Sequence, residues 1–206
     1  MTVAGNIYGV VLNDAQERGR LASQFDEKPY AKPPVAPVVY MKPRSSLARA
    51  SVAVPADTGL TASTTLAVLI ARDTGGVSES EVAACIGAMA LALDLSLPSE
   101  SYYRPAIAQK NGDGRLALAE FAAPAMPGAI RLKADGRPIH EWTLDRLVRP
   151  LERLVADLGA FLTLKAGDVL LVGLPGDAPV IRPGQSLRVE ADGLPALDIA
   201  TTGEQA

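Results

Sequence analysis

The sequence predicts an α+β fold built mainly from mixed β-sheets, with a few helices. Short apolar runs rich in branched residues, as at 7–12 and 66–71, are typical of buried strands. An Asp-Gly dipeptide at 135–136 separates two further extended runs, which predicts a hairpin. Apolar residues at helical spacing predict helices near 78–91 and 150–162.

The N-terminal part of the chain changes character several times. A polar stretch at 15–27, helical or irregular, follows the first strand, and residues 28–37 contain four prolines. Each proline fixes φ and disfavours helix before it, which predicts an extended path into a short buried strand at 38–41. We therefore divide one compact unit into an N-terminal strand with an extended segment, 1–34, and a main domain, 35–206.

The middle of the chain alternates a strand, a helix and a long loop. The continuous apolar run at 66–71 suits a strand buried on both faces. Ser78 and Glu81 fit a capping box, in which each side chain meets a backbone N–H of the other residue. The apolar residues that follow predict a core helix over 78–91. Residues 96–124 are predicted to be irregular, and loops of that length are usually functional.

The C-terminal part is predicted to contain a hairpin, a helix and two late strands. The hairpin joins strands at 130–133 and 138–142. The helix near 150–162 begins at a proline, whose missing N–H does little harm in a first turn. Late strands are expected at 168–173 and 186–190.

Composition excludes several classes of protein. With 206 residues, 48% hydrophobic and 21% charged, the chain should be globular. The net charge of −3 and the pI of about 5.2 argue against nucleic acid or an anionic membrane as the main partner. No apolar run approaches the roughly 18 residues that span a bilayer, and no targeting segment is recognised. We therefore expect a cytoplasmic protein.

Cysteine and histidine are each present once. Cys85 excludes an internal disulfide and a cysteine-rich zinc site, and its apolar surroundings predict a buried structural thiol. His140 falls on the predicted hairpin, where a solvent-facing or packing role is favoured over catalysis. Packing is also expected for Trp142.

Several segments occur in the order and spacing of one enzyme family. They are Lys42-Pro-Arg-Ser-Ser46, Leu66–Ile70, Lys110-Asn-Gly-Asp113, Leu162–Asp168, Gly173-Leu-Pro175 and Arg182-Pro-Gly184. Together, over roughly residues 35 to 200, they resemble the fumarylacetoacetate hydrolase family. The resemblance implies that family's mixed-sheet fold and its enolate chemistry.

The resemblance also implies a metal site whose ligands are mostly replaced. In that family a strand carries Glu-x-Glu and a later segment an Asp, and these carboxylates hold Mg²⁺ or Mn²⁺. The matching positions here are Ser63, Thr65 and Asp94. Because hard divalent cations prefer carboxylate oxygen, we expect no metal cofactor in this chain. Asp94 is then a hydrogen-bonded relic in a polar cavity.

A narrower resemblance covers Ser96-Leu-Pro-Ser-Glu-Ser-Tyr-Tyr-Arg-Pro105. This segment is similar to one branch of the family, the N-terminal half or subunit of the bifunctional isomerase/decarboxylases of homoprotocatechuate (4-hydroxyphenylacetate) degradation. Those enzymes contain two copies of the fold, and the C-terminal copy keeps the metal carboxylates. The resemblance therefore implies a homologous partner subunit that binds Mg²⁺ or Mn²⁺, in a dimer or higher oligomer.

Candidate ligand-binding residues follow from the same resemblance. The substrates it implies are di- or tricarboxylates, which arginine binds in bidentate fashion. The candidates are Lys42, Arg44, Tyr102, Tyr103, Arg104 and Lys110. Lys110 matches the family's pocket lysine and is the catalytic candidate, whereas Arg104 and the tyrosines are equally suited to subunit contacts. The family's hydrolases also use a His–Glu pair near the N-terminus, and this sequence has no histidine there.

Two hypotheses remain open at this point. In the first, the chain is an enzyme subunit of an assembly that isomerises 5-carboxymethyl-2-hydroxymuconate and decarboxylates 5-oxopent-3-ene-1,2,5-tricarboxylate. Isomerisation needs only proton transfer, which Lys110 or a tyrosine can assist without metal. In the second, the chain is a metal-less, non-catalytic partner that completes and stabilises an active homologous subunit.

Overall fold

The structure is a computed structural model that describes residues 3–28, 31–99 and 107–204. The larger of two sheets contains β1 (Ile7–Val11), β2 (Val38–Lys42), β4 (Leu60–Ile70), β5 (Ile86–Ser96), β6 (Leu116–Leu118), β9 (Val169–Leu171) and β10 (Val180–Ile181). The smaller contains β3 (Ser51–Val54), β7 (Ala129–Ala134), β8 (Arg137–Thr143), β11 (Ser186–Glu190) and β12 (Leu197–Gly203). The helices are α1 (Ala15–Arg20), α2 (Ala22–Phe25), α3 (Ile107–Lys110) and α4 (Leu151–Gly159), with short 3₁₀ helices η1 (Arg44–Ser46), η2 (Glu79–Cys85) and η3 (Leu144–Arg146).

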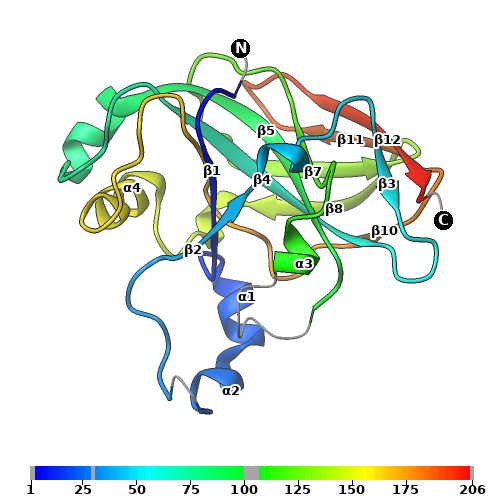
Figure 1. The fold of residues 1–206 in the computed structure, drawn as a ribbon, viewed down its shortest axis with the longest axis horizontal. Helices are drawn as coiled ribbons and strands as arrows, with labels where there is room; N and C mark the ends of the chain where they lie inside the picture. The colour runs from blue at the N-terminus through cyan, green and yellow to red at the C-terminus, as the bar shows by residue number, and fades with distance from the viewer. Residues whose placement is uncertain (1–2, 29–30, 100–106, 205–206) are drawn as a thin grey trace.

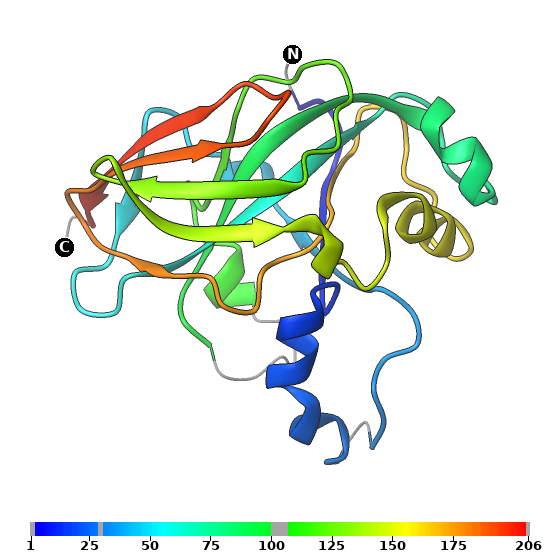
Figure 2. The same ribbon diagram turned by 180° about the vertical axis from the view of Figure 1, so that it is seen from behind.

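The two sheets pack against each other, with the helices at their margins (Figure 1). The larger sheet has the strand order β2-β1-β9-β4-β5-β6, with β10 paired to β4, and the smaller the order β3-β12-β11-β7-β8. Figure 2 shows the smaller sheet in front of the long strands β4 and β5. Parallel and antiparallel pairs occur in both sheets. This arrangement confirms the predicted α+β fold of mixed sheets.

The long strands β4 and β5 form the centre of the core. They pair with each other in antiparallel register, and β4 also pairs with β9. Leu66, Ala67 and Val68 are consecutive in β4 and all fully buried. Consecutive strand residues point to opposite faces, so this strand is buried on both, as its apolar run predicts. In the smaller sheet β11 instead alternates buried and exposed residues, which is typical of a sheet that faces the core on one side.

Several predicted elements are confirmed. Asp135 and Gly136 connect β7 to β8 and both have positive φ, 51° and 78°, as a tight hairpin turn requires. The helix expected near 150–162 is α4, and the late strands are β9 and β11. Cys85 is a free, buried thiol, as expected.

The helix predicted over 78–91 is wrong. Ser78 and Glu81 do form the capping box, but they open the short 3₁₀ helix η2, and the chain turns into β5 at Ile86. From there nearly every residue is apolar and buried on both faces, so spacing alone does not distinguish helix from strand. Pairing with β4 along almost its whole length makes this segment a strand, because tertiary contacts override a weak local preference.

Other boundaries also differ from expectation. The region at 96–124 contains α3 and β6 within its described part, so it is less irregular than predicted. The strand β2 is largely half-buried rather than buried. The strands β3 and β12 were not predicted; they form a parallel pair whose register is set by contacts about 150 residues apart.

The N-terminal segment joins the larger sheet and then leaves it. The strand β1 pairs with β2 on one side and β9 on the other. After it, α1 and α2 project from one end of the sheet, at the bottom of Figure 1. In the described part of the chain, no helix is both long and apolar enough to cross a bilayer.

Candidate functional site

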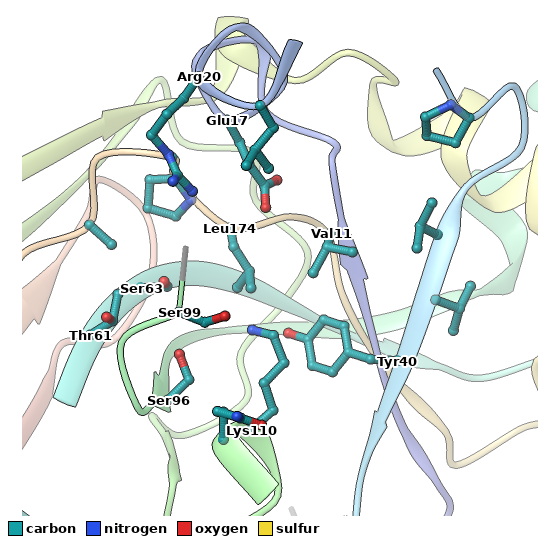
Figure 3. Close-up of a pocket in the computed structure, with 18 of the residues that line it drawn as sticks. Val11, Glu17, Arg20, Tyr40, Thr61, Ser63, Ser96, Ser99, Lys110 and Leu174 are labelled. Atoms are coloured by element: carbon teal, nitrogen blue, oxygen red, sulfur yellow. The ribbon is translucent and has the colours of Figure 1, made fainter. Parts of the chain in front are cut away.

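A cavity of about 950 Å³ lies where α1 meets the larger sheet (Figure 3). Its walls come from α1, the proline-rich segment before β2, the strands β2 and β4, the chain after β5, α3, and the loop at 174–178. Among its lining residues, those with charged or ring-hydroxyl side chains are Glu17, Arg20, Lys32, Tyr40 and Lys110. Aliphatic side chains and prolines form much of the remaining wall, so the cavity suits an organic ligand with charged ends.

The three positions that the sequence resemblance matches to metal ligands lie together. Ser63 and Asp94 are directly opposite each other in the β4–β5 pair, and Thr65 follows Ser63 on the same face. Asp94 is 1% exposed and both of its oxygens are engaged. Lys42 Nζ lies 3.0 Å from Oδ1, and the Tyr40 hydroxyl donates to Oδ2 at 2.5 Å.

These residues do not fit Mg²⁺ or Mn²⁺. Ser63 and Thr65 offer neutral hydroxyls, and the single carboxylate of Asp94 already has an ammonium and a phenol as partners. Across the described ranges, no group of three or more His, Cys, Asp or Glu side chains is arranged to hold a metal ion. Hard cations need several anionic oxygen donors, so no step is assigned to a metal in this chain.

Lys42 is placed as an internal counter-ion. It is 2% exposed and does not line the cavity. Besides Asp94, its ammonium donates to the carbonyls of Leu95, Lys110 and Arg115 at 3.1, 2.7 and 2.7 Å. Burial lowers the pKa of Lys42, and the charge of Asp94 opposes that effect. These contacts connect β2 to β5 and to the backbone of Lys110 and Arg115.

Tyr40 separates the Asp94 cluster from the cavity. Its ring lines the cavity wall, and a side chain at Gly9, its cross-strand neighbour, would collide with that ring. Burial and the charge of Asp94 raise the pKa of Tyr40 well above its usual value, so the phenol stays protonated as a donor. Lys110 Nζ lies 4.7 Å from the centre of the same ring, a cation–π distance.

Glu17 is a pocket residue that the sequence reasoning missed. It lies on α1 and is 9% exposed, and Leu12 N–H donates to its Oε2 at 2.5 Å. Burial raises its pKa to about 7, while Lys110 and Arg20 oppose the rise and the charge of Asp14 adds to it. A carboxyl group with this pKa exchanges protons at neutral pH, which is the property of a general acid or base.

Asp14 holds Glu17 in place. Its carboxylate accepts the Glu17 N–H at 2.8 Å as the N-cap of α1, and it also accepts from Trp142, Arg146 and Gly176. Burial alone would raise the pKa of Asp14, but the Arg146 hydrogen bonds and the others lower it. A spacing of Asp-x-x-Glu directly after a strand is a helix-start signal, and it was available in the sequence. In the structure the Glu17 carboxylate instead accepts from the backbone N–H of Leu12, directly after β1.

The other candidates are placed as follows. Lys110 lines the cavity. Arg44 is exposed and donates to the carbonyl of Ala4 at 3.2 Å, away from the described lining. Tyr102, Tyr103 and Arg104 lie outside the described residues.

The two aromatic residues of the hairpin bond to carboxylates, Trp142 to the N-cap of α1 and His140 to Asp177. Trp142 is fully buried and donates to Asp14 at 2.9 Å. His140 Nε2 lies 3.2 Å from Asp177, which in turn pairs with Arg146. Neither ring lines the cavity among the described residues.

Comparison with known proteins decides the family. The model of the fumarylacetoacetate (FAA) hydrolase C-terminal domain matches residues 6–200. The chain belongs to the fumarylacetoacetate hydrolase family. A 4-hydroxyphenylacetate degradation bifunctional isomerase/decarboxylase of Escherichia coli is 33% identical over 98% of this chain, but the match covers 48% of that protein. The chain therefore spans about half the length of such relatives.

One further relative and one solved structure are also similar to this chain. An oxaloacetate tautomerase of Escherichia coli K12 is 30% identical, over 78% of this chain and 80% of its own length. The crystal structure of a 5-carboxymethyl-2-hydroxymuconate delta-isomerase from Mycobacterium smegmatis superposes with a TM-score of 0.80 at 21% identity. That match covers 99% of this chain and 81% of the isomerase, and it shows the fold.

Proposed function

We propose that this chain is the N-terminal half or subunit of a bifunctional 5-carboxymethyl-2-hydroxymuconate isomerase / 5-oxopent-3-ene-1,2,5-tricarboxylate decarboxylase in 4-hydroxyphenylacetate catabolism. Support comes from the relative that is 33% identical over 98% of this chain and about twice as long. The second half is then a homologous copy with intact carboxylates, which holds Mg²⁺ or Mn²⁺, in a dimer or higher oligomer. The cytoplasmic location expected from the sequence belongs to the same proposal.

The observation that carries a catalytic role for this chain is Glu17 in the cavity, with its pKa raised to about 7. Isomerisation of a conjugated 2-hydroxy acid removes the proton of the enol oxygen and adds one to a carbon further along the conjugated chain. Glu17 takes up and returns that proton, because it is evenly divided between its two forms near neutral pH.

Lys110 supplies the positive charge that this step needs. As the proton leaves the enol oxygen, negative charge develops there, and an ammonium in a partly apolar cavity stabilises it. The hydroxyl of Tyr40 is committed to Asp94 and is therefore not assigned the proton transfer. This division of roles needs no metal in this chain.

The alternative is a non-catalytic partner that stabilises the metal-binding copy. The observation in its favour is the Lys42–Asp94–Tyr40 cluster, in which the former ligand position serves the internal packing of the chain. Under this alternative the cavity residues have no effect on turnover.

An activity assay of the isolated chain, and of the chain mixed with its homologous copy, distinguishes the two, each with and without Mg²⁺. We expect metal-independent isomerisation by the isolated chain. The loss of kcat in Glu17→Gln should be about 100-fold or more, as is typical for removal of a general base. Glu120→Gln, an exposed carboxylate, is the matched control. The structural alternative is established if the isolated chain has no activity and if Glu17→Gln and Lys110→Gln leave the activity of the mixture unchanged.

A further inference from the structure

Three side chains that end in a cation line the cavity without an ion pair to any described residue: Arg20, Lys32 and Lys110. Several other arginines of the described ranges have ion pairs, for example Arg146 with Asp14 and Asp177. Glu17 is the acidic member of the lining, and it has no ion pair either. The cavity thus carries an excess of positive charge that an anionic ligand would neutralise.

Arg20 and Lys110 reach the cavity from different elements. Arg20 is the last residue of α1, and Lys110 is the last residue of α3. Figure 3 shows the two side chains entering from opposite sides of the view, Arg20 beside Glu17 and Lys110 beside Tyr40. Both are close enough to Glu17 to influence its charge. Glu17 therefore lies within the field of two cations that belong to different elements.

The wall around these charges is apolar. Val11, Leu174 and Pro175 are among the apolar lining residues, and Figure 3 places Leu174 in the middle of the view, between Arg20 and Lys110. An apolar wall between two positive ends matches a short carbon chain with an anionic group at each end. A guanidinium also presents a planar fork that binds a carboxylate through two hydrogen bonds.

We infer that Arg20 binds the second carboxylate of a dicarboxylate ligand whose first carboxylate or enolate end is held by Lys110, so that Arg20 determines preference for dicarboxylates over monocarboxylates. The inference deepens the proposed function, because it uses the same cavity. It concerns recognition, whereas the proposed catalysis depends on Glu17. Arg20 was not a candidate from the sequence.

Isothermal titration calorimetry with simple acids tests the inference without turnover. The probes are succinate, glutarate and adipate, each against the monocarboxylate of equal chain length, with inorganic phosphate as a compact dianion. We expect at least one dicarboxylate to bind the wild-type chain about tenfold tighter than its monocarboxylate partner, which corresponds to about 1.4 kcal/mol. Phosphate should bind more weakly than that dicarboxylate, because it does not reach both cations.

The variants assign the effect to Arg20. Arg20→Gln should weaken the preferred dicarboxylate about tenfold and leave its monocarboxylate partner within about twofold. Lys110→Gln should weaken both. Arg72→Gln removes the same charge from an exposed residue outside the lining and should change neither. Arg20→Lys should recover part of the affinity, since it keeps the charge and loses the fork.

Several results would overturn the inference. These are wild-type protein that binds no dicarboxylate, or that shows no preference over monocarboxylates, or a preference that survives Arg20→Gln. If Arg20→Gln weakens the binding of the dicarboxylate and of the monocarboxylate equally, the inference is also contradicted. Equal weakening would mean that Arg20 only adds to the general electrostatic attraction for anions. A preserved dicarboxylate preference in a chain that lacks isomerase activity would instead refute the catalytic proposal and leave this inference standing.

Discussion

Asp94 and Glu17 are both buried carboxylates of the candidate site, 1% and 9% exposed, yet their surroundings differ. Asp94 has the ammonium of Lys42 at 3.0 Å and the hydroxyl of Tyr40 at 2.5 Å. Glu17 has one backbone N–H and no ion pair with a described residue. A buried charge needs a partner, and a carboxyl group without one favours its neutral form. Asp94 is thus held by internal partners, whereas Glu17, which has no ion pair among the described residues, keeps a proton to exchange.

The largest expected effect comes from removing the counter-ion of Asp94. Lys42→Met leaves a buried carboxylate unpaired and three backbone carbonyls without their donor. We expect a loss of about 3–5 kcal/mol in the free energy of unfolding. Urea denaturation at pH 7 measures it.

The double variant Lys42→Met/Asp94→Asn is the control for this experiment. Because it removes the charge that Lys42 neutralises, it should recover part of the loss. If Lys42→Met costs less than about 1 kcal/mol, the pair does not have the internal role assigned to it.

The second effect concerns the proton on Glu17. Its pKa rises from 4.5 to about 7 on folding, so the folded state favours the neutral form. The resulting penalty is absent below about pH 4.5, grows between pH 4.5 and 7, and is complete above pH 7. Glu17→Gln should therefore be more stable than wild type at pH 8, by up to about 3 kcal/mol, and similar to it at pH 4.5.

Denaturation of both proteins across this pH range checks the sign as well as the size. Glu120→Gln, at an exposed position, should show no such dependence. A Glu17→Gln curve parallel to that of wild type would mean that Glu17 is not held neutral by burial. The charges that face Glu17 are those of Lys110, Asp14 and Arg20. A change in the pH at which the stability difference reaches half its full size would therefore report on these charges.

The third prediction concerns a variant that is designed to bind Mn²⁺ at Asp94. Wild-type protein should show no micromolar Mn²⁺ site in calorimetry. Ser63→Glu/Thr65→Glu restores the carboxylates on the face of β4 that Asp94 shares. Mn²⁺ at a hundredfold excess over its Kd should then stabilise that variant by about 2.7 kcal/mol.

The same titration on the double variant with Asp94→Ala added is the control, and it should remove the site. A wild-type Mn²⁺ site that depends on Asp94 would contradict the comparison made above. So would a double variant with no metal response, because it would mean that these positions are not aligned with the family's ligands.

The sequence by itself determined the features that depend on near neighbours or on motif order. The positive φ values at Asp135 and Gly136 follow from the turn that this dipeptide favours. The family motifs predicted the mixed sheets, and they matched Ser63, Thr65 and Asp94 to the family's ligand positions, which stays a prediction. These conclusions need only residue types and spacing, which are present in the chain before it folds.

The tertiary structure decided the rest. The chain from Ile86 is a strand because β4 pairs along it, and no local spacing carries that information. Lys42 is an internal counter-ion because folding brings it to a residue 52 positions away. The pKa of Glu17 depends on burial and on Lys110 and Arg20, which reach the cavity from different elements. Desolvation and the distances between charges exist only in the folded chain, so the resemblance in the sequence could propose equivalents of metal ligands, whereas Glu17 emerged as a titrating group only from the structure.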